Sequence, residues 1–281
     1  YFLIMTEVLH TVKQMQRRIN IWKDKGFSVG LVPTMGSIHA GHLSMIKRAR
    51  KICDRTIVSI FINPLQFGPN EDYKSYPKNF SSDKRILNTM GVHLLYQPSL
   101  SEIYPSNFQT IVSVSGITKC LCGLFRPGHF EGVATIITKL FLQILPNIAF
   151  FGEKDYQQLL VIQKLVKDFS FPIKIKSVPI VRERDGLAFS SRNSYLTKDQ
   201  RLLAPNFYKT IYEISKQVNQ GRRIANVLNG KKRYLLKLGF DKVDYLEVRS
   251  SANLKKLKVL KKPARVFGAV HLGKTRLIDN C

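Results

Sequence analysis

The chain has 281 residues, of which 44% are hydrophobic and 10% aromatic, and it carries a formal net charge of +26 at pH 7. A chain of this length and composition buries a substantial core, which excludes an intrinsically disordered protein. No apolar run approaches the roughly 20 residues that a membrane-spanning helix needs, so the sequence predicts no membrane span.

Helical and strand-like patterns alternate from the start of the chain to about residue 178. Residues 2–5 are predicted as a first strand, with Thr6 as the cap of the helix that follows. Further strands are predicted at 27–32, 55–62, 93–97, 110–115, 148–151 and 173–178, and helices at 42–52, 81–90, 132–145 and 155–166. Short apolar strands separated by amphipathic helices predict an α/β fold, a Rossmann-like parallel sheet with helices on both faces.

Beyond residue 178 the pattern changes to Lys-rich helical segments followed by strand-like pieces at 244–250 and 264–272. This change predicts a second, smaller α+β domain at the C-terminus. We therefore expect one domain at residues 1–178 and another at residues 179–281.

The positive charge is spread over both parts of the chain and is densest in LKKLKVLKKPAR at residues 254–265. Such a segment could bind RNA or a polyphosphate. We favour a solvated helix or turn in which the lysine stems cover apolar neighbours while the ammonium groups stay in water.

The cysteines and the first residues indicate the compartment. Cys53, Cys120, Cys122 and Cys281 fit neither a zinc pattern nor a small disulfide framework. The opening YFLIM is too short for the core of a signal peptide. A reducing cytoplasm is the expected location.

VPTMGSIHAGH at residues 32–42 has the composition of a ligand-binding turn between a strand and a helix. In an open parallel sheet, ligands lie at the carboxyl ends of the strands, where the next helix offers free N–H groups. Gly36 permits the turn, Gly41 permits close approach to the backbone, and His39 and His42 stand at the start of the helix. Two histidines without a third ligand favour a phosphate site over a metal site.

FFGEKDYQQL at residues 150–159 is a second strand that ends in glycine and charged residues. Gly152 opens space and Lys154 can neutralise a phosphate. Asp155 can either cap the following helix or accept a hydrogen bond from a ribose hydroxyl. Capping alone leaves Glu153, Lys154 and the paired amides of residues 157 and 158 unexplained.

Three more loops carry polar side chains. GLAFSSRNSYLT places Ser190, Ser191 and Arg192 near the expected domain boundary, either as a loop that closes over phosphates or as an ordinary polar linker. FINPLQF places Asn63 and Gln66 after a strand, and RPGHFEGVATII places His129 before a helix.

These segments, in this order, closely resemble the pantothenate synthetases, also called pantoate:beta-alanine ligases. The similarity extends along nearly the whole chain, from LVPTMGSIHAGH through FINPLQF, YP, RPGHFEGVATI, FFGEKDYQQL and SSRN to TRLIDN. HAGH alone is similar to the HIGH-type signature of nucleotidylyltransferases and class I aminoacyl-tRNA synthetases, with SSRN in the place of their KMSKS-type loop.

The resemblance implies a two-step reaction. Pantoate attacks the α-phosphorus of ATP to give pantoyl adenylate and pyrophosphate, and β-alanine then displaces AMP to give pantothenate. It also implies Mg²⁺ carried mainly by ATP, a cytoplasmic homodimer, residues 1–178 as the ATP- and pantoate-binding domain, and residues 179–281 as a lid. No resident metal, membrane or nucleic-acid partner is expected.

Carried over residue by residue, the resemblance implies that His42 is the catalytic acid. Gln66 would bind pantoate and β-alanine, Gln158 would bind pantoate, and Asn63 and His129 would line the same substrate site. ATP would be bound by Met35, Gly36, Ser37, Ile38, His39, Ala40, Gly41, His42, Gly152, Glu153, Lys154, Asp155, Val181, Phe189, Ser190, Ser191 and Arg192.

Two positions depart from the usual family pattern: Phe189 stands where Met or Leu is common, and Ala40 where a polar residue is common. Neither departure removes a charged or hydrogen-bonding group from the site. Two other classes stay open: a different adenylyl- or cytidylyltransferase, and a basic RNA-binding module to which only the charge points.

Overall fold

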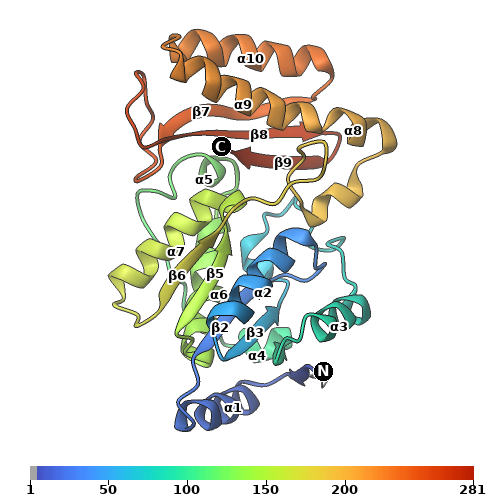
Figure 1. The fold of residues 1–281 in the computed structure, drawn as a ribbon, viewed down its shortest axis with the longest axis vertical. Coiled ribbons are helices and arrows are strands. Elements are labelled where there is room, and N and C mark those ends of the chain that lie inside the picture. Colours follow the sequence, from blue (N-terminus) through green and yellow to red (C-terminus); the bar gives the residue numbers. More distant parts are fainter. Residues whose placement is uncertain (1–4) are drawn as a thin grey trace. The chain divides into compact units, whose positions relative to one another are not determined.

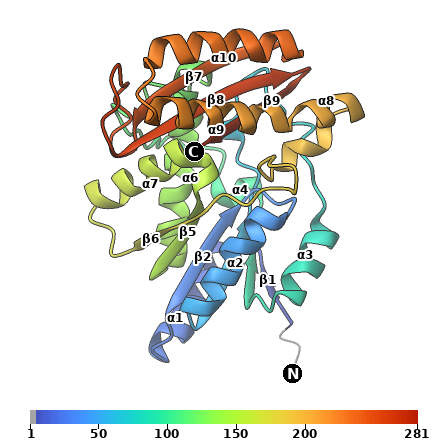
Figure 2. The same ribbon diagram turned by 45° about the horizontal axis from the view of Figure 1, so that its top comes forward.

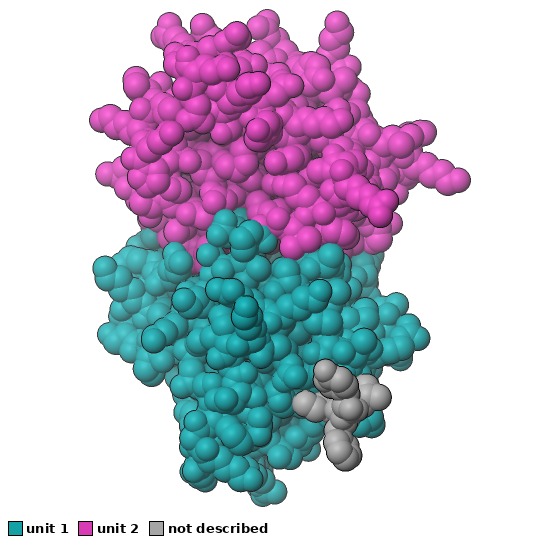
Figure 3. Space-filling view, in the orientation of Figure 1, with its two compact units in different colours: residues 1–115, 126–153, 161–179 teal, residues 116–125, 154–160, 180–281 magenta. Residues whose placement is uncertain are grey.

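The computed structural model of the chain describes residues 5–281. It divides into two compact units, coloured separately in Figure 3. The first unit contains residues 1–115, 126–153 and 161–179, and the second contains residues 116–125, 154–160 and 180–281. The second unit therefore takes in two earlier segments besides the expected C-terminal region. The functional division at residue 178 into a binding domain and a lid stays a prediction.

The first unit is built on a six-stranded parallel sheet with the strand order β1-β4-β3-β2-β5-β6 (Figures 1 and 2). The strands are β1 (Glu7–Leu9), β2 (Val29–Thr34), β3 (Arg55–Ile60), β4 (Leu94–Tyr96), β5 (Ile148–Gly152) and β6 (Lys174–Val178). The prediction of a parallel α/β sheet is confirmed.

Both faces of this sheet are covered because its central strands are apolar on both sides. On one face, Val32 and Val58 belong to a buried cluster with Ile46 of helix α2 (Ala40–Ile52). On the other face, the Tyr96 hydroxyl donates to Gln143 of helix α6 (His129–Ile144) over 3.0 Å. Alternate residues of a strand point to opposite faces, so helices are needed on each side.

The remaining helices of the first unit are α1 (Val12–Asp24), α3 (Phe80–Thr89), α4 (Leu100–Ile103) and the 3₁₀ turn η1 (Pro64–Gln66). Thr11, not Thr6, caps α1. The Thr11 side chain accepts from the Gln14 N–H, and the Gln14 side chain accepts from the Thr11 N–H. Thr6 is buried and donates to the Val92 carbonyl instead. Except for Met5, which lies outside β1, the strand predicted at residues 2–5 falls outside the described residues.

The second unit contains an antiparallel sheet, β7 (Lys242–Ser250), β8 (Ala264–Leu272) and β9 (Thr275–Asn280), in the order β7-β8-β9. Its helices are α5 (Cys122–Phe125), α8 (Lys198–Leu203), α9 (Pro205–Asn219) and α10 (Ile224–Leu238), with the 3₁₀ turn η3 (Ser191–Tyr195). Helix α7 (Tyr156–Asp168) follows the 3₁₀ turn η2 (Glu153–Asp155), and its first residues belong to this unit. The C-terminal α+β prediction is confirmed.

One local prediction, the strand at residues 110–115, needs correction. Residues 110–115 form no strand, although their β-branched residues favour one. The Lys-rich stretch at residues 254–265 lies mostly in the connection between β7 and β8, and its lysines are exposed, so it is the solvated turn that we favoured. Within residues 5–281, no helix is both long and apolar enough to cross a membrane.

Candidate active site

The carboxyl ends of β2 and β5 lie at the point where the strand order of the sheet reverses. From β2 the chain builds outward through β3 and β4, and it then returns to add β5 and β6 on the other side of β2. Ligands of open α/β sheets bind in the crevice at such a reversal. The predicted residues Met35–His42 follow β2, and Gly152 and Glu153 lie at the end of β5 and just beyond it.

The loop after β2 is held in an unusual backbone conformation. Gly36 and Ser37 have φ values of 85° and 53°, a region that favours glycine. The Asp83 carboxylate, 3% exposed, accepts the N–H groups of Ser37 and Ile38, each over 2.8 Å. The Thr34 hydroxyl accepts from the Gly36 N–H over 3.1 Å. The side chains of Thr34 and Asp83 thus hold the backbone of this loop.

The two histidines stand together at the start of α2. His39 is the N-cap, and its Nδ1 accepts from the Gly41 N–H over 3.1 Å. The His39 N–H points to Nδ1 of His42 over 3.4 Å, and the ring centroids lie 4.0 Å apart. Because each Nδ1 accepts a backbone N–H, each neutral ring carries its proton on Nε2. Donors at a helix N-terminus suit an anion.

The loop after β3 carries Asn63 and Gln66. Asn63 is 1% exposed, and its side chain hydrogen-bonds to the Gly132 carbonyl (2.9 Å), Gln66 Oε1 (3.1 Å), the Tyr104 hydroxyl (2.9 Å) and the Leu65 N–H (3.4 Å). The Gln66 amide nitrogen lies 3.0 Å from Met35 Sδ. The loops that follow β2 and β3 are therefore in contact.

His129 and Arg126 hold the backbone of this second loop. Nδ1 of His129 lies 2.9 Å from the Gln66 carbonyl, and Arg126 donates to the same carbonyl over 3.3 Å. Arg126 also forms a two-pronged ion pair with Glu71 at 2.6 and 2.7 Å. Burial acts to raise the pKa of Glu71, but these guanidinium contacts hold it below its ordinary value. His129 thus contacts the backbone of the residue predicted to bind substrate.

The segment after β5 carries Lys154 and Asp155 in the second unit. Their side chains approach to 3.8 Å, and the Lys154 carbonyl accepts from Asn280 over 2.9 Å. The Lys154 side chain is 20% exposed and that of Asp155 45% exposed. Both charges are therefore partly accessible beside the start of α7.

The neighbouring glutamines of α7 have different environments. The buried amide of Gln157 donates to the carbonyls of Ile117 and Cys120, each over 2.8 Å, and accepts from the Cys122 N–H over 3.0 Å. Gln158 is half-buried, and its amide makes no hydrogen bond to the described part of the chain. Gln157 therefore holds the segment 117–122, and Gln158 is the amide that remains available for a ligand.

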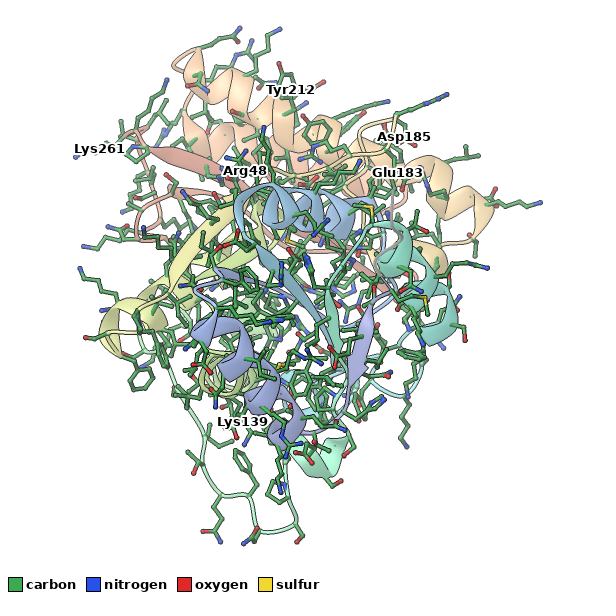
Figure 4. The ribbon with its side chains drawn as sticks, turned by 60° about the horizontal axis from the view of Figure 1, so that its bottom comes forward. Arg48, Lys139, Glu183, Asp185, Tyr212 and Lys261 are labelled. Atoms are coloured by element: carbon green, nitrogen blue, oxygen red, sulfur yellow. The ribbon has the colours of Figure 1, made fainter. Side chains whose placement is uncertain are left out.

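The segment from Val181 to Arg192 forms a short hairpin within the second unit. The Phe189 N–H donates to the Val181 carbonyl over 3.1 Å, and Ser190 caps η3 by accepting from the Arg192 N–H over 3.3 Å. Arg201 pairs with both acids of this hairpin, Glu183 and Asp185, which are labelled in Figure 4. The predicted set Val181 and Phe189–Arg192 is thus brought together as one element.

A family model described as pantoate-beta-alanine ligase matches residues 7–281. The chain belongs to the pantoate-beta-alanine ligase family. It is 49% identical over 273 residues to a pantothenate synthetase of Paramagnetospirillum magneticum, covering 97% of this chain and 96% of that relative.

Solved structures of the family have the same fold. Pantothenate synthetase from Thermus thermophilus matches with a TM-score of 0.93 at 41% identity, covering 98% of this chain and 99% of that one. Pantoate-beta-alanine ligase from Francisella tularensis matches with a TM-score of 0.79 at 36% identity, covering 98% and 97%. That structure is a complex with beta-gamma ATP and β-alanine.

Several residues that build the site in this family member were not predicted from the sequence. Asp83, Tyr104 and Gly132 come from helices or loops far from the motifs that they support. Asp83 lies in the first turn of a predicted helix, where an acidic residue is ordinary. No local pattern distinguishes these residues, because their roles depend on contacts between distant segments.

Proposed function

We propose that the chain catalyses the ATP-dependent condensation of pantoate with β-alanine to pantothenate, through pantoyl adenylate. The observation that carries this proposal is the family match over residues 7–281, which includes the His39–His42 turn at the reversal point of the sheet. The complex of the Francisella relative with ATP and β-alanine supports the same pair of substrates.

In the first step, a carboxylate oxygen of pantoate bonds to the α-phosphorus of ATP, and the bond from that phosphorus to the pyrophosphate oxygen breaks. In the second step, the β-alanine amine attacks the acyl carbon, AMP leaves, and the amine loses a proton. Such transfers need positioned reactants and stabilised phosphate charge more than a covalent nucleophile.

The proposed roles follow from that chemistry. His39, His42 and the start of α2 would meet the phosphates, with His42 as the acid for the departing pyrophosphate. Lys154 and Arg192 would supply further positive charge, and Gln66 and Gln158 would bind pantoate. The different environments of Gln157 and Gln158 support assigning Gln158, not its neighbour, to the substrate.

Mg²⁺ is proposed to accompany ATP, bound mainly by phosphate oxygens and water. The described residues contain no group of three or more His, Cys, Asp or Glu side chains arranged to hold a metal ion. No step is therefore assigned to a metal ion held by the protein alone.

We also propose that the protein is a cytoplasmic homodimer and that residues 179–281 act as a lid. Four free thiols fit a reducing compartment. If the hairpin that ends in Phe189–Arg192 covers ATP, nucleotide should slow amide hydrogen exchange over residues 186–193. Equal exchange with and without ATP would contradict the lid.

Isotope exchange between ATP and pyrophosphate tests the reaction. Exchange should require pantoate and Mg²⁺ but not β-alanine, because the adenylate forms first. A panel of other small carboxylic acids serves as the control for substrate identity. Exchange that demands β-alanine would contradict the two-step route, and equal exchange with an unrelated acid would favour a different adenylyltransferase.

Replacing His42 by Ala tests the catalytic assignment. Loss of a donor to the developing charge should lower the exchange rate by roughly a hundredfold or more. The melting temperature should stay close to that of the wild type, which separates catalysis from folding. An unchanged rate would refute the assignment of His42.

A further inference from the structure

We propose that Tyr104, acting through Asn63, sets the orientation of the Gln66 side-chain amide, so that Gln66 presents hydrogen-bond donors to its substrate. The inference rests on the proposed function, in which Gln66 binds pantoate. It makes Tyr104 a positioning residue, because Tyr104 reaches Gln66 only through another side chain.

The orientation of the Asn63 amide is fixed by two backbone groups, one of which can only accept a hydrogen bond and the other only donate one. One end of its amide lies 2.9 Å from the Gly132 carbonyl, which can only accept. The other end lies 3.4 Å from the Leu65 N–H, which can only donate. Only the arrangement with Nδ2 at Gly132 and Oδ1 at Leu65 satisfies both groups.

The orientation of Gln66 follows from that of Asn63. Asn63 Nδ2 also points to the end of the Gln66 amide, at 3.1 Å, and the atom that receives it must be Oε1. The Gln66 nitrogen is therefore at the other end, 3.0 Å from Met35 Sδ. A thioether sulfur is a weak acceptor, so an oxygen of a bound substrate would be the better partner.

Tyr104 is the third side chain in this chain of hydrogen bonds. Its hydroxyl lies 2.9 Å from Asn63 Oδ1, and because Oδ1 accepts, the phenol donates. Burial raises the pKa of Tyr104 well above its usual range, so the phenol keeps its proton at neutral pH. Without this donor, Asn63 Oδ1 would keep only the long contact from Leu65, and its buried amide would be poorly held.

The Tyr104 ring is held independently of its hydroxyl. Its centroid lies 4.9 Å from that of Phe108 and 6.0 Å from that of Phe61. Lys139, labelled in Figure 4, lies over the same pair, with Nζ 4.7 Å from the Phe108 centroid and 5.9 Å from that of Tyr104. Replacing Tyr104 by Phe therefore removes the donor while keeping the packing.

The orientation determines which substrate groups Gln66 recognises. Two N–H donors suit carboxylate and hydroxyl oxygens, which pantoate carries, and they repel an ammonium group. A Gln66 turned the other way would present an acceptor and lose this preference. Any contact of Gln66 with β-alanine should therefore involve its carboxylate and not its amine.

The test compares Tyr104→Phe with Tyr96→Phe, a buried phenol that likewise donates to an amide oxygen, that of Gln143. Tyr104→Phe should raise KM for pantoate roughly threefold to tenfold, as expected for one hydrogen bond, with KM for ATP within about twofold of wild type. Tyr96→Phe should lower the melting temperature without changing KM for pantoate. An unchanged KM in Tyr104→Phe, or an equal rise in both variants, would overturn the inference.

A double-mutant cycle tests whether the effect passes through Gln66. The dissociation constant for pantoate, measured by calorimetry, should rise in Tyr104→Phe and in Gln66→Ala, but Tyr104→Phe should add nothing in the Gln66→Ala background. Additive effects would refute the relay. If the wild type shows neither pantoate binding nor pantoate-dependent exchange, the proposed function fails as well.

Discussion

Position 132 in α6 requires glycine because there is no room for a side chain, and not because of its backbone conformation. A Cβ at this position would lie 2.3 Å from the carbonyl carbon and oxygen of Leu65 and 2.5 Å from the Gln66 nitrogen. These are backbone atoms of the loop that carries Gln66, so they cannot move aside as a flexible side chain can. The close approach of α6 thus places this loop.

Gly132→Ala should therefore lower the free energy of unfolding by roughly 1–3 kcal/mol and raise KM for pantoate, because the loop must shift. The matched control is Gly230→Ala in α10, where a Cβ meets no atom within 4 Å. There the change should increase stability by up to about 1 kcal/mol, since alanine favours a helix. Urea unfolding and steady-state kinetics check both; similar behaviour of the two variants would contradict the argument.

His93 makes stability depend on pH. Burial, together with the positive charges of Arg50 and Arg55, lowers the pKa of His93 to about 4. Its Nδ1 accepts from the Thr56 N–H over 3.1 Å, and Arg50 donates to the same ring. A protonated ring could accept neither hydrogen bond, so the folded chain holds His93 neutral.

Because an unfolded histidine takes up its proton near pH 6.5, stability from His93 is complete above that pH and is lost as pH falls toward 4. Melting temperatures measured across this window should fall less steeply in His93→Gln, whose amide can accept the same N–H without titrating. Parallel curves for the two proteins would show that His93 does not contribute.

At the scale of elements, the connection from β2 to α2 depends on Asp83 of α3. Asp83→Asn leaves only one acceptor for the two N–H groups of Ser37 and Ile38. Loss of one buried hydrogen bond, with an amide NH₂ facing an N–H, costs about 1–3 kcal/mol. We expect KM for ATP to rise roughly tenfold on that scale.

The control lies at the other end of β2, where Asp54 accepts from the N–H and hydroxyl of Ser28 over 2.9 and 2.6 Å. Asp54→Asn changes an exposed carboxylate that also accepts a backbone N–H, away from the loop, and should leave KM for ATP unchanged. If both variants raise KM for ATP equally, Asp83 has no special role in placing the loop.

Strands were predicted correctly from the sequence where the local hydrophobic pattern alone determines the structure. The strands β2 to β5 are apolar runs that sheet burial requires, and strands are present where they were predicted. β6, at the edge of the sheet, was also predicted, although its two lysines are exposed. Residues 110–115 have the same β-branched character, but they form no strand within the described chain, because a strand also needs a neighbour to pair with. β9 was missed as a strand because TRLIDN has little apolar alternation of its own.

The candidate site likewise contains residues that local motifs indicate and residues that they do not. Motifs predicted the candidate ligand-binding side chains His39, His42, Gln66 and Gln158, which lie in loops or first helical turns that follow strands. The residues that hold them, such as Asp83 and Tyr104, are 46 and 41 positions away from their partners along the chain. Only the folded structure brings these pairs together.

At the scale of the whole molecule, the proposed homodimer should have twice the monomer mass of 32.2 kDa. Leu142 and Leu145, at the end of α6, are 55% and 45% exposed, and a surface covered by a second copy would bury them. Sedimentation of the wild type should give the dimer, and Leu142→Glu should shift it toward monomer. A monomeric wild type at micromolar concentration would contradict the proposal.

The second unit is assembled from three separate stretches of chain, and this limits how the protein can be divided. A fragment that begins at residue 180 would lack Cys122 and Phe125, which contact Tyr245 of β7, and Tyr156, whose hydroxyl bonds to the Ser251 carbonyl. A gene chimera joined near residue 179 would likewise combine β7 to β9 from one parent with residues 116–125 and 154–160 from the other. Exchange between relatives should therefore preserve function best when 116–125, 154–160 and 180–281 come from the same ancestor, so these three stretches should be inherited together.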